Sequence, residues 1–383
     1  MPPTGGRRNA VGVWSMLMGK RIYWIDNLKA IGIFLVVLGH CPINPQIRHY
    51  IYSFHMPLFF FISGYLFNRN RYENFRIFLI RKFRTLIIPY FTFAFTSYLF
   101  WLIIVRNLSI RGESLRVSPI KPLLGIFYSI GVDGWSVPLD AALWFLTCLF
   151  LVEILFWFIS SMCKKTLYLM FILISLAALG YTGSLFAPIR LPWSMDVALT
   201  AVVFYGVGCT LKRKIEDLTG SVSIKFILLP CLFLISVVFC FLNGRIHMNS
   251  NYYNNIFFFY ISAFAGILCC LMISKLLRGN VISDYIGRNT IIIVGLSGVS
   301  RFFIRGIYYL VFKQLLDISK CSIGMGIFWA CFQILSLVPF MYIINTYCPF
   351  ILGRDSKKLK SGGGVVCLRK CLKVLISFCC GKH

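Results

Sequence analysis

The stretch that decides the fold is IDNLKAIGIFLVVLGHC, residues 25–41. Its second half is as apolar as a membrane-spanning helix, yet the stretch holds Asp26, Lys29 and His40. An ionisable side chain in hydrocarbon is costly unless it has a partner or lines a wet cavity, so such residues are functional candidates. We therefore expect a membrane protein in which this helix carries chemistry.

The composition of the whole chain agrees with this interpretation. Of the 383 residues, 58% are hydrophobic and only 13% are charged, and the mean hydropathy is +0.79. Apolar runs of about 17–25 residues span a bilayer. They predict an all-α polytopic membrane protein with about ten transmembrane helices, at 22–41, 51–67, 86–105, 140–160, 166–182, 191–211, 224–242, 256–276, 290–312 and 323–347.

The distribution of charge predicts the orientation and the domains. Most of the 39 Lys and Arg residues lie in the two ends of the chain and in the connections after the even-numbered helices. Cytoplasmic loops accumulate these residues, so we expect both termini to be cytoplasmic. The expected organisation is an N-terminal segment 1–21, a membrane domain 22–352 and a basic, Cys-containing tail 353–383. A short apolar piece at 122–132 is expected to be re-entrant or interfacial.

The net charge of +27 has a simple explanation in this topology and in anionic lipid headgroups. We therefore expect membrane lipid, and no nucleic acid, as a partner. The 15 cysteines form no CxxC pair and no spacing typical of metal ligands. We expect neither disulfides nor a metal.

The polar residues of the first helix share one face. Lys29 and His40 are separated by about three helical turns, a rise of about 16 Å, and Asp26 lies one turn before Lys29. Asp26 and Lys29 can therefore pair, whereas His40 lies toward the far side of the membrane. The alternative is that Asp26 and Lys29 form only an interfacial pair, and that His40 is a structural histidine whose hydrogen bonds are satisfied at a helix end.

The second helix and the loop after it add further candidates. In YSFHMPLFFFISGYLF, residues 52–67, His55 lies near the level of His40, and Ser63 precedes a glycine that allows close helix contact. In the following basic loop, Arg81 and Arg84 have i, i+3 spacing, which suits binding of phosphate groups. The alternative for this loop is an anchor on the inner leaflet.

These motifs resemble the integral-membrane acyltransferase type 3 family, and more narrowly its fucose 4-O-acetylase-like branch of sugar O-acetyltransferases. The matching features are the Lys29–His40 spacing, FHMPLFFFISGYLF, the Arg-x-x-Arg of the basic loop, ALWFLTCLF at 142–150, LPWSMDVALTAVVFYGVGCTLKR at 191–213 and IGRNTIIIV at 286–294. Leu149 stands where many members with a large extracytoplasmic domain have a glutamate, and GLSGVS follows IGRNTIIIV where a histidine is expected.

The resemblance implies an enzyme of the bacterial inner membrane. It would take an acetyl group from cytoplasmic acetyl-CoA and transfer it to a hydroxyl of a surface glycan or a lipid-linked oligosaccharide, such as O-antigen or capsule, on the other side. Carried over to this chain, the catalytic residues are His40, Lys29 and Asp26, and the donor-binding residues are Arg81 and Arg84. The candidates for substrate binding are His55, Ser63, Trp144 and Asp196.

Two questions stay open at the level of sequence. His40 either deprotonates the acceptor hydroxyl or is itself transiently acetylated. A polytopic transporter or flippase for a lipid-linked or anionic glycan is the competing class, since many carriers also hold polar residues within the membrane.

Overall fold

The computed structural model describes residues 22–108, 118–132, 135–139, 142–163, 165–212, 214, 222–313 and 322–354. Within these residues the regular secondary structure is helical, with no β-strand, which confirms the predicted all-α class. The predicted N-terminal segment 1–21 and nearly all of the tail 353–383 lie outside the described residues.

A helix occupies each of the ten apolar stretches. By length and composition, seven of the described helices can cross a membrane: Phe75–Leu108, Trp144–Met162, Thr166–Phe186, Pro192–Thr210, Ile256–Leu276, Thr290–Val311 and Ile323–Tyr347. The described part of a further helix, Ile227–Asn243, is apolar but shorter. The remaining two stretches are α2 (Tyr23–Gly39), which has 17 residues, and α3 (Pro45–Tyr65), whose first turns are polar.

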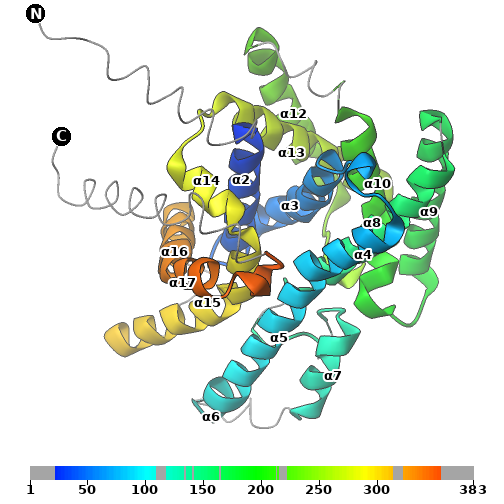
Figure 1. Ribbon diagram of the computed structural model, residues 1–383. Helices are drawn as coiled ribbons and strands as arrows, with labels where there is room; N and C mark the ends of the chain where they lie inside the picture. Colours follow the sequence, from blue (N-terminus) through cyan, green and yellow to red (C-terminus); the bar gives the residue numbers. More distant parts are fainter. Residues whose placement is uncertain are drawn as a thin grey trace, which may run out of the picture.

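Helix α2 lies inside the bundle (Figure 1). It packs against α3, α13 (Ile256–Leu276), α14 (Val281–Arg288), α15 (Thr290–Phe312) and α16 (Ile323–Ser336). Asn27 fixes its first turn, because the amide group donates to the carbonyls of Ser274 and Leu277 and accepts from the hydroxyl of Ser283. Buried amide groups need such partners. These bonds set the position of α2, and therefore that of the residues along it.

Helix α3 crosses the bundle and packs closely on α10 (Met195–Thr210). The contact depends on two glycines. A Cβ atom at Gly64 would lie 1.9 Å from the carbonyl oxygen of Tyr205, and one at Gly208 would lie 2.3 Å from that of Phe61. The backbones of the two helices thus approach as closely as small residues permit.

The other helices surround this centre. The long apolar element from Phe75 to Leu108 consists of α4 (Phe75–Lys82), a π-helical turn Phe83–Ile87, α5 (Ile88–Phe100), a second π-helical turn Trp101–Val105, and α6 (Arg106–Leu108). The short apolar piece predicted at 122–132 overlaps α7 (Ile120–Tyr128). The remaining helices are α8 (Trp144–Met162), α9 (Thr166–Phe186), α12 (Val222–Asn243), α17 (Val338–Tyr347) and the 3-10 turns Arg69–Arg71, Pro192–Ser194, Met248–Ser250 and Pro349–Leu352.

The last 3-10 turn returns the chain to the basic loop. Gly353 follows it with a φ of +64°, and a Cβ atom there would lie 2.3 Å from the carbonyl oxygen of Arg84. Arg354 then donates to the side chain of Asn345 and to the carbonyl of Arg288. The described chain therefore ends packed against the segment that carries Arg84.

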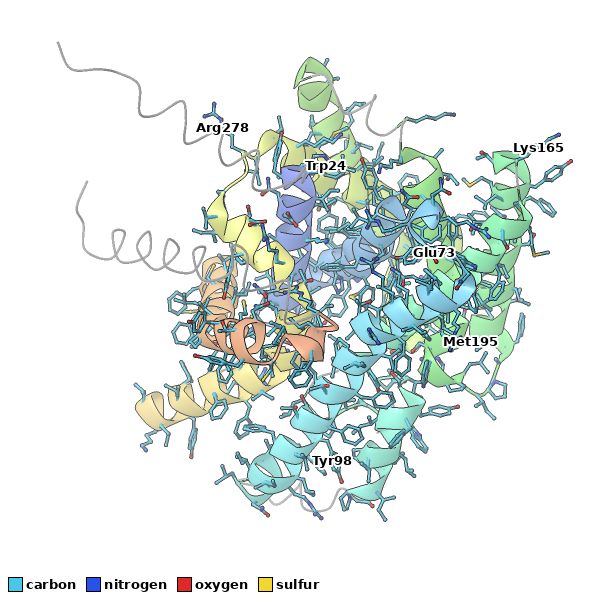
Figure 2. The ribbon with its side chains drawn as sticks, in the orientation of Figure 1. Trp24, Glu73, Tyr98, Lys165, Met195 and Arg278 are labelled. Carbon is cyan, nitrogen blue, oxygen red and sulfur yellow. The ribbon has the colours of Figure 1, made fainter. Side chains whose placement is uncertain are left out.

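The start of α2 and the connections after α8 and α13 lie toward one end of the bundle. Figure 2 places Trp24, Lys165 and Arg278 toward this end, and Met195 and Tyr98 toward the opposite one. This placement agrees with helices that run alternately in opposite directions.

Candidate active site

Three histidines from separate parts of the chain line one cavity of about 90 Å³. A buried water needs only about 10–15 Å³ on the same measure, so the space is large enough for a small chemical group. Its lining residues are His40, Tyr52, His55, Met56, Ala142, Trp144, His247, Met248 and Asn249.

His40 reaches this cavity from the end of α2, where it is the C-cap. Its Nδ1 lies 2.8 Å from the carbonyl oxygen of Val36. A carbonyl can only accept, so Nδ1 carries the hydrogen, and the neutral ring then has its lone pair on Nε2. This tautomer leaves one ring nitrogen of His40 able to accept a proton or form a bond.

His55 is held in the same way on the neighbouring helix. Its Nδ1 lies 2.8 Å from the carbonyl oxygen of Ile51, and its side chain is buried. Tyr52 lies between the two imidazoles: its ring centroid is 6.1 Å from that of His40 and 5.1 Å from that of His55. His40 and His55 therefore line the same cavity, with a tyrosine between them.

His247 belongs to the connection between α12 and α13. Its backbone pairs with that of Tyr252, and its Nδ1 lies 2.7 Å from the hydroxyl of Ser250. Its ring centroid is 5.8 Å from that of Tyr52. Burial, and then the positive charge of Arg245, lower the pKa of His247. A lowered pKa keeps this imidazole neutral near physiological pH.

At the C-terminal end of α3 lies a cluster of cationic and aromatic side chains. The ring of Phe67, just after α3, contacts that of Phe78 on α4, with centroids 6.3 Å apart. Phe78 stacks on Trp157 of α8 at 4.4 Å, and the guanidinium carbon of Arg69 lies 4.8 Å from the Trp157 ring centroid. Such contacts stabilise a cation. Arg81 lies over Tyr72 at 5.7 Å.

Arg81 and Arg84 are both exposed beside this cluster. Arg81 is in the last turn of α4, whereas Arg84 is in the π-helical turn that follows. The i, i+3 geometry expected for a regular α-helix is therefore changed between them. Lys82, between the two, forms a 2.6 Å ion pair with the buried Glu153 of α8. This pair anchors the arginine-bearing segment to the bundle.

The amino-acid sequence matches a known protein family. The model of the family described as "Acyltransferase domain" matches residues 22–354, which is most of the chain. The chain belongs to this acyltransferase type 3 family. No curated protein and no solved structure matches it. Together with the apolar helices, the match makes the protein an integral-membrane acyltransferase.

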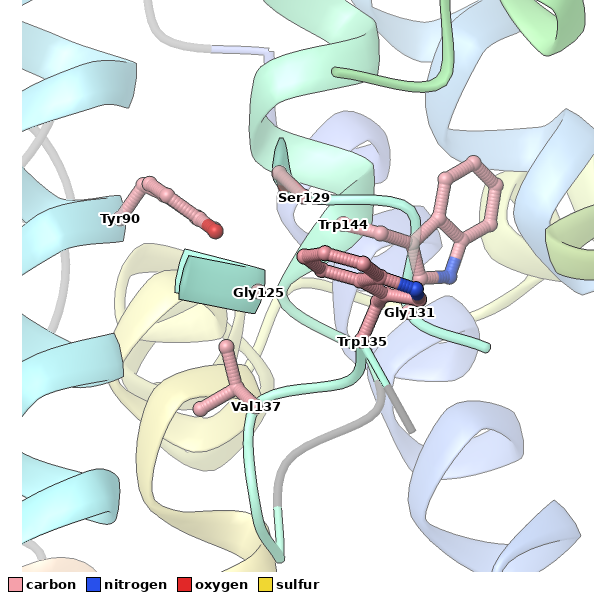
Figure 3. Close-up of a pocket in the computed structure, with 7 residues that line it drawn as sticks. All are labelled: Tyr90, Gly125, Ser129, Gly131, Trp135, Val137 and Trp144. Carbon is pink, nitrogen blue, oxygen red and sulfur yellow. The ribbon is translucent and has the colours of Figure 1, made fainter. Parts of the chain in front are cut away.

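Trp144 contributes to two neighbouring spaces in the acyltransferase. It lines the histidine cavity, and it also lines a second, narrow space (Figure 3) together with Tyr90, Gly125, Ser129, Gly131, Trp135 and Val137. The hydroxyl of Tyr90 donates to the carbonyl of Ile126 at 2.5 Å. The second space has no room for a water molecule, so it is part of the packed wall behind Trp144.

Asp196 lies outside the lining of the histidine cavity and forms an ion pair with Arg190. Arg190 also donates to the carbonyl of Asn249 at 2.9 Å, and the Asn249 amide donates to the carbonyl of Gly131. Asp196 is therefore connected to the cavity through Arg190, and its role in substrate binding stays a prediction. Asp196 holds Arg190, and Arg190 holds the segment that supplies His247.

The other predicted residues lie away from the cavity. Ser63 is half-buried on α3, eight residues or about 12 Å of helix beyond His55. Asp26 is buried and Lys29 half-buried near the start of α2, and both interact with neighbouring groups. At the same end, Lys275 lies 5.0 Å from the Trp24 ring centroid, so this end of α2 is rich in basic and aromatic side chains.

Tyr52 and His247 line the cavity but were not among the residues predicted from the sequence. For Tyr52 a signal was available, because it lies one helical turn before His55. His247 had none, since it comes from a connection 192 residues further along the chain than His55 and only tertiary contacts bring it to the cavity.

Proposed function

We propose that this acyltransferase takes an acetyl group from acetyl-CoA in the bacterial cytoplasm and transfers it to a hydroxyl of a surface glycan on the other side of the inner membrane. This is the activity of fucose 4-O-acetylase-like enzymes, the branch that its motifs resemble. One observation carries the proposal: a histidine-lined cavity lies beside the middle of α3, and a cationic and aromatic cluster lies at the C-terminal end of the same helix.

The cluster suits the donor. Coenzyme A carries several phosphate charges and does not cross a bilayer, whereas its acetyl group is small and neutral. Arg81 and Arg84 are exposed and would bind the phosphates. The ion pair between Lys82 and Glu153 would keep these arginines in place on the cytoplasmic side.

The cavity suits the acceptor. The Nε2 lone pair of His40 would accept the proton of a sugar hydroxyl as its oxygen attacks the thioester carbon, and coenzyme A would leave as the thiol after taking up a proton. In the alternative route, Nε2 first forms an acetyl-imidazole and then passes the acetyl group to the sugar. His55, Tyr52 and His247 surround the space in which the hydroxyl would lie.

A reconstituted system tests this function. Purified protein in liposomes receives acetyl-CoA and polysaccharide from cells that lack the gene. We expect free coenzyme A thiol to appear only when polysaccharide is present, and O-acetyl signals to appear in its NMR spectrum. A transporter would release no thiol. Absence of both signals from folded protein would contradict the proposal.

A further inference from the structure

Arg48 lies beside the histidine cavity and has no part in the reaction described above. It is in the first turns of α3, where one of its terminal nitrogens donates to the carbonyl of Cys41 at 3.0 Å. Its Nε is buried and has no acceptor among the described residues. Nor does any described carboxylate form an ion pair with it.

A guanidinium group whose buried Nε has no acceptor is energetically unfavourable. A buried donor on a charged group costs free energy when no acceptor meets it. Native proteins rarely leave such groups unsatisfied, and the exceptions often have a functional reason. Arg48 as a whole is only half-buried, so an acceptor from outside the chain can reach its guanidinium group.

Arg48 lies on the face of α3 that leads to the cavity. Arg48, Tyr52 and His55 are spaced at i, i+4 and i+7, which places them along one side of a helix. The rise is about 6 Å from Arg48 to Tyr52 and about 10 Å to His55. The Tyr52 ring lies 6.1 Å from that of His40, centroid to centroid, so a carboxylate and a hydroxyl on the same or an adjoining sugar ring can reach Arg48 and His40 together.

The surroundings of the cavity are basic as well. The cationic side chains that act electrostatically on His40 are Arg301 and Arg48, and Arg245 acts on His247. Among the described carboxylates, Asp196 is the one tied to the wall of the cavity, and it pairs with Arg190. The described part of this site therefore favours a negatively charged ligand.

We propose that the acceptor carries an anionic group, a carboxylate or a phosphate, that binds Arg48 while the hydroxyl to be acetylated lies against His40. This inference rests on the proposed function and adds the class of its acceptor. A guanidinium binds both anions through charge-assisted hydrogen bonds, and its planar fork makes it more selective in direction than a lysine.

The experiment uses the full-length protein in liposomes with acetyl-CoA. Polysaccharide from cells that lack the gene is divided into anionic and neutral fractions by anion exchange. We expect O-acetyl groups in the anionic fraction. Arg48→Gln should raise the KM for this fraction about ten- to hundredfold, the effect of one lost charge-assisted hydrogen bond. Arg48→Lys should recover part of the loss.

Chemical removal of the charge identifies its source. Carboxyl reduction neutralises uronic acids, whereas hydrogen fluoride removes phosphate. The treatment that removes the anionic group bound by Arg48 should raise the KM of the wild-type protein to that of the Arg48→Gln variant. The KM of the variant should be the same for treated and untreated acceptor. Arg278→Gln is the matched control, because this exposed arginine lies toward the other end of the bundle (Figure 2).

Three results would overturn the inference. Acetylation confined to the neutral fraction would do so while leaving the proposed function intact. An Arg48→Gln variant that loses the same activity toward native and neutralised acceptor would also overturn it, because Arg48 would then be a structural residue. A loss of activity that depends on the anionic lipid content of the liposomes would make Arg48 a lipid-binding residue. If the wild-type protein acetylates neither fraction, the proposed function itself fails, and the acceptor class with it.

Discussion

The phenol ring of Tyr52 lies 5.1 Å from the imidazole of His55, and its hydroxyl is 3.3 Å from the carbonyl oxygen of Gly39, the residue before His40. One side chain of α3 therefore touches the end of α2 and separates two histidines. Any chemistry of His40 takes place on a helix end that α3 holds in position.

The first prediction concerns His40. His40→Ala should reduce acetyl transfer by at least about 10²-fold, the usual contribution of a general base, because no group would then take the hydroxyl proton. Expression and thermal stability in detergent should stay near wild type, since the imidazole donates only to Val36 within its own helix. Initial rates of thiol release measure the effect.

His55→Ala serves as its control. This residue lies in the same cavity but is more buried, so its loss should affect acceptor binding more than the chemical step. Full activity of folded His40→Ala protein would exclude the catalytic role.

The second prediction concerns the donor arginines. Arg81→Ala and Arg84→Ala should each weaken acetyl-CoA binding by about 1.5–3 kcal/mol, the range for a hydrogen bond to a charged group. Isothermal titration with the detergent-solubilised protein measures the change. Arg76→Ala is the matched control, an exposed arginine on the same helix. Equal binding by all three variants would leave these arginines as lipid anchors.

The third prediction concerns the ion pair between Lys82 and Glu153. Lys82→Met should destabilise the protein by about 3–5 kcal/mol, because it leaves a buried carboxylate without its partner. The double variant Lys82→Met, Glu153→Gln should recover most of this loss, since no charge then remains buried. Thermal unfolding in detergent gives both values. A double variant as unstable as the single one would mean that the pair contributes through packing alone.

The fourth prediction is a pH effect of His247. Burial and Arg245 lower its pKa, so the folded protein keeps the ring neutral while the unfolded chain binds a proton below about pH 6.5. The contribution of His247 to stability is therefore complete above pH 6.5 and decreases as the pH falls toward the lowered value. His247→Gln should lose less stability than wild type between pH 6.5 and 5. If the free energy of unfolding falls equally in the two proteins between pH 6.5 and 5, this prediction is wrong.

Hydropathy predicted the helices well where the apolar run itself sets the boundary. The expected span 256–276 coincides with α13, and 22–41 differs from α2 by only one or two residues at each end. Hydropathy was less accurate where a capping residue, rather than the end of an apolar run, sets the boundary of a helix. Helix α3 begins at Pro45 rather than near 51, because Asn44 caps the amide of Gln46 and the helix then tolerates polar residues in its first turn.

The same effect limited the prediction of the site. Arg48 falls between the expected spans 22–41 and 51–67, although the cap places it on α3. Composition suggested no chemistry for His247, because its position depends on Ser250, Tyr252 and a clamp from Arg190. His40 could be proposed as a candidate because an ionisable side chain is conspicuous within an apolar run of sequence.

The packing of Gly353 on Arg84 has a consequence for engineering the chain. Because a Cβ atom there would meet the Arg84 carbonyl, a substitution at the very end of the domain acts on the donor segment, far away in sequence but adjacent in space. A shortened protein should therefore keep Arg354, whose bonds hold this end in place. A reporter fused after Arg354 would lie beside Arg84, where it would obstruct the proposed binding of coenzyme A or respond to it.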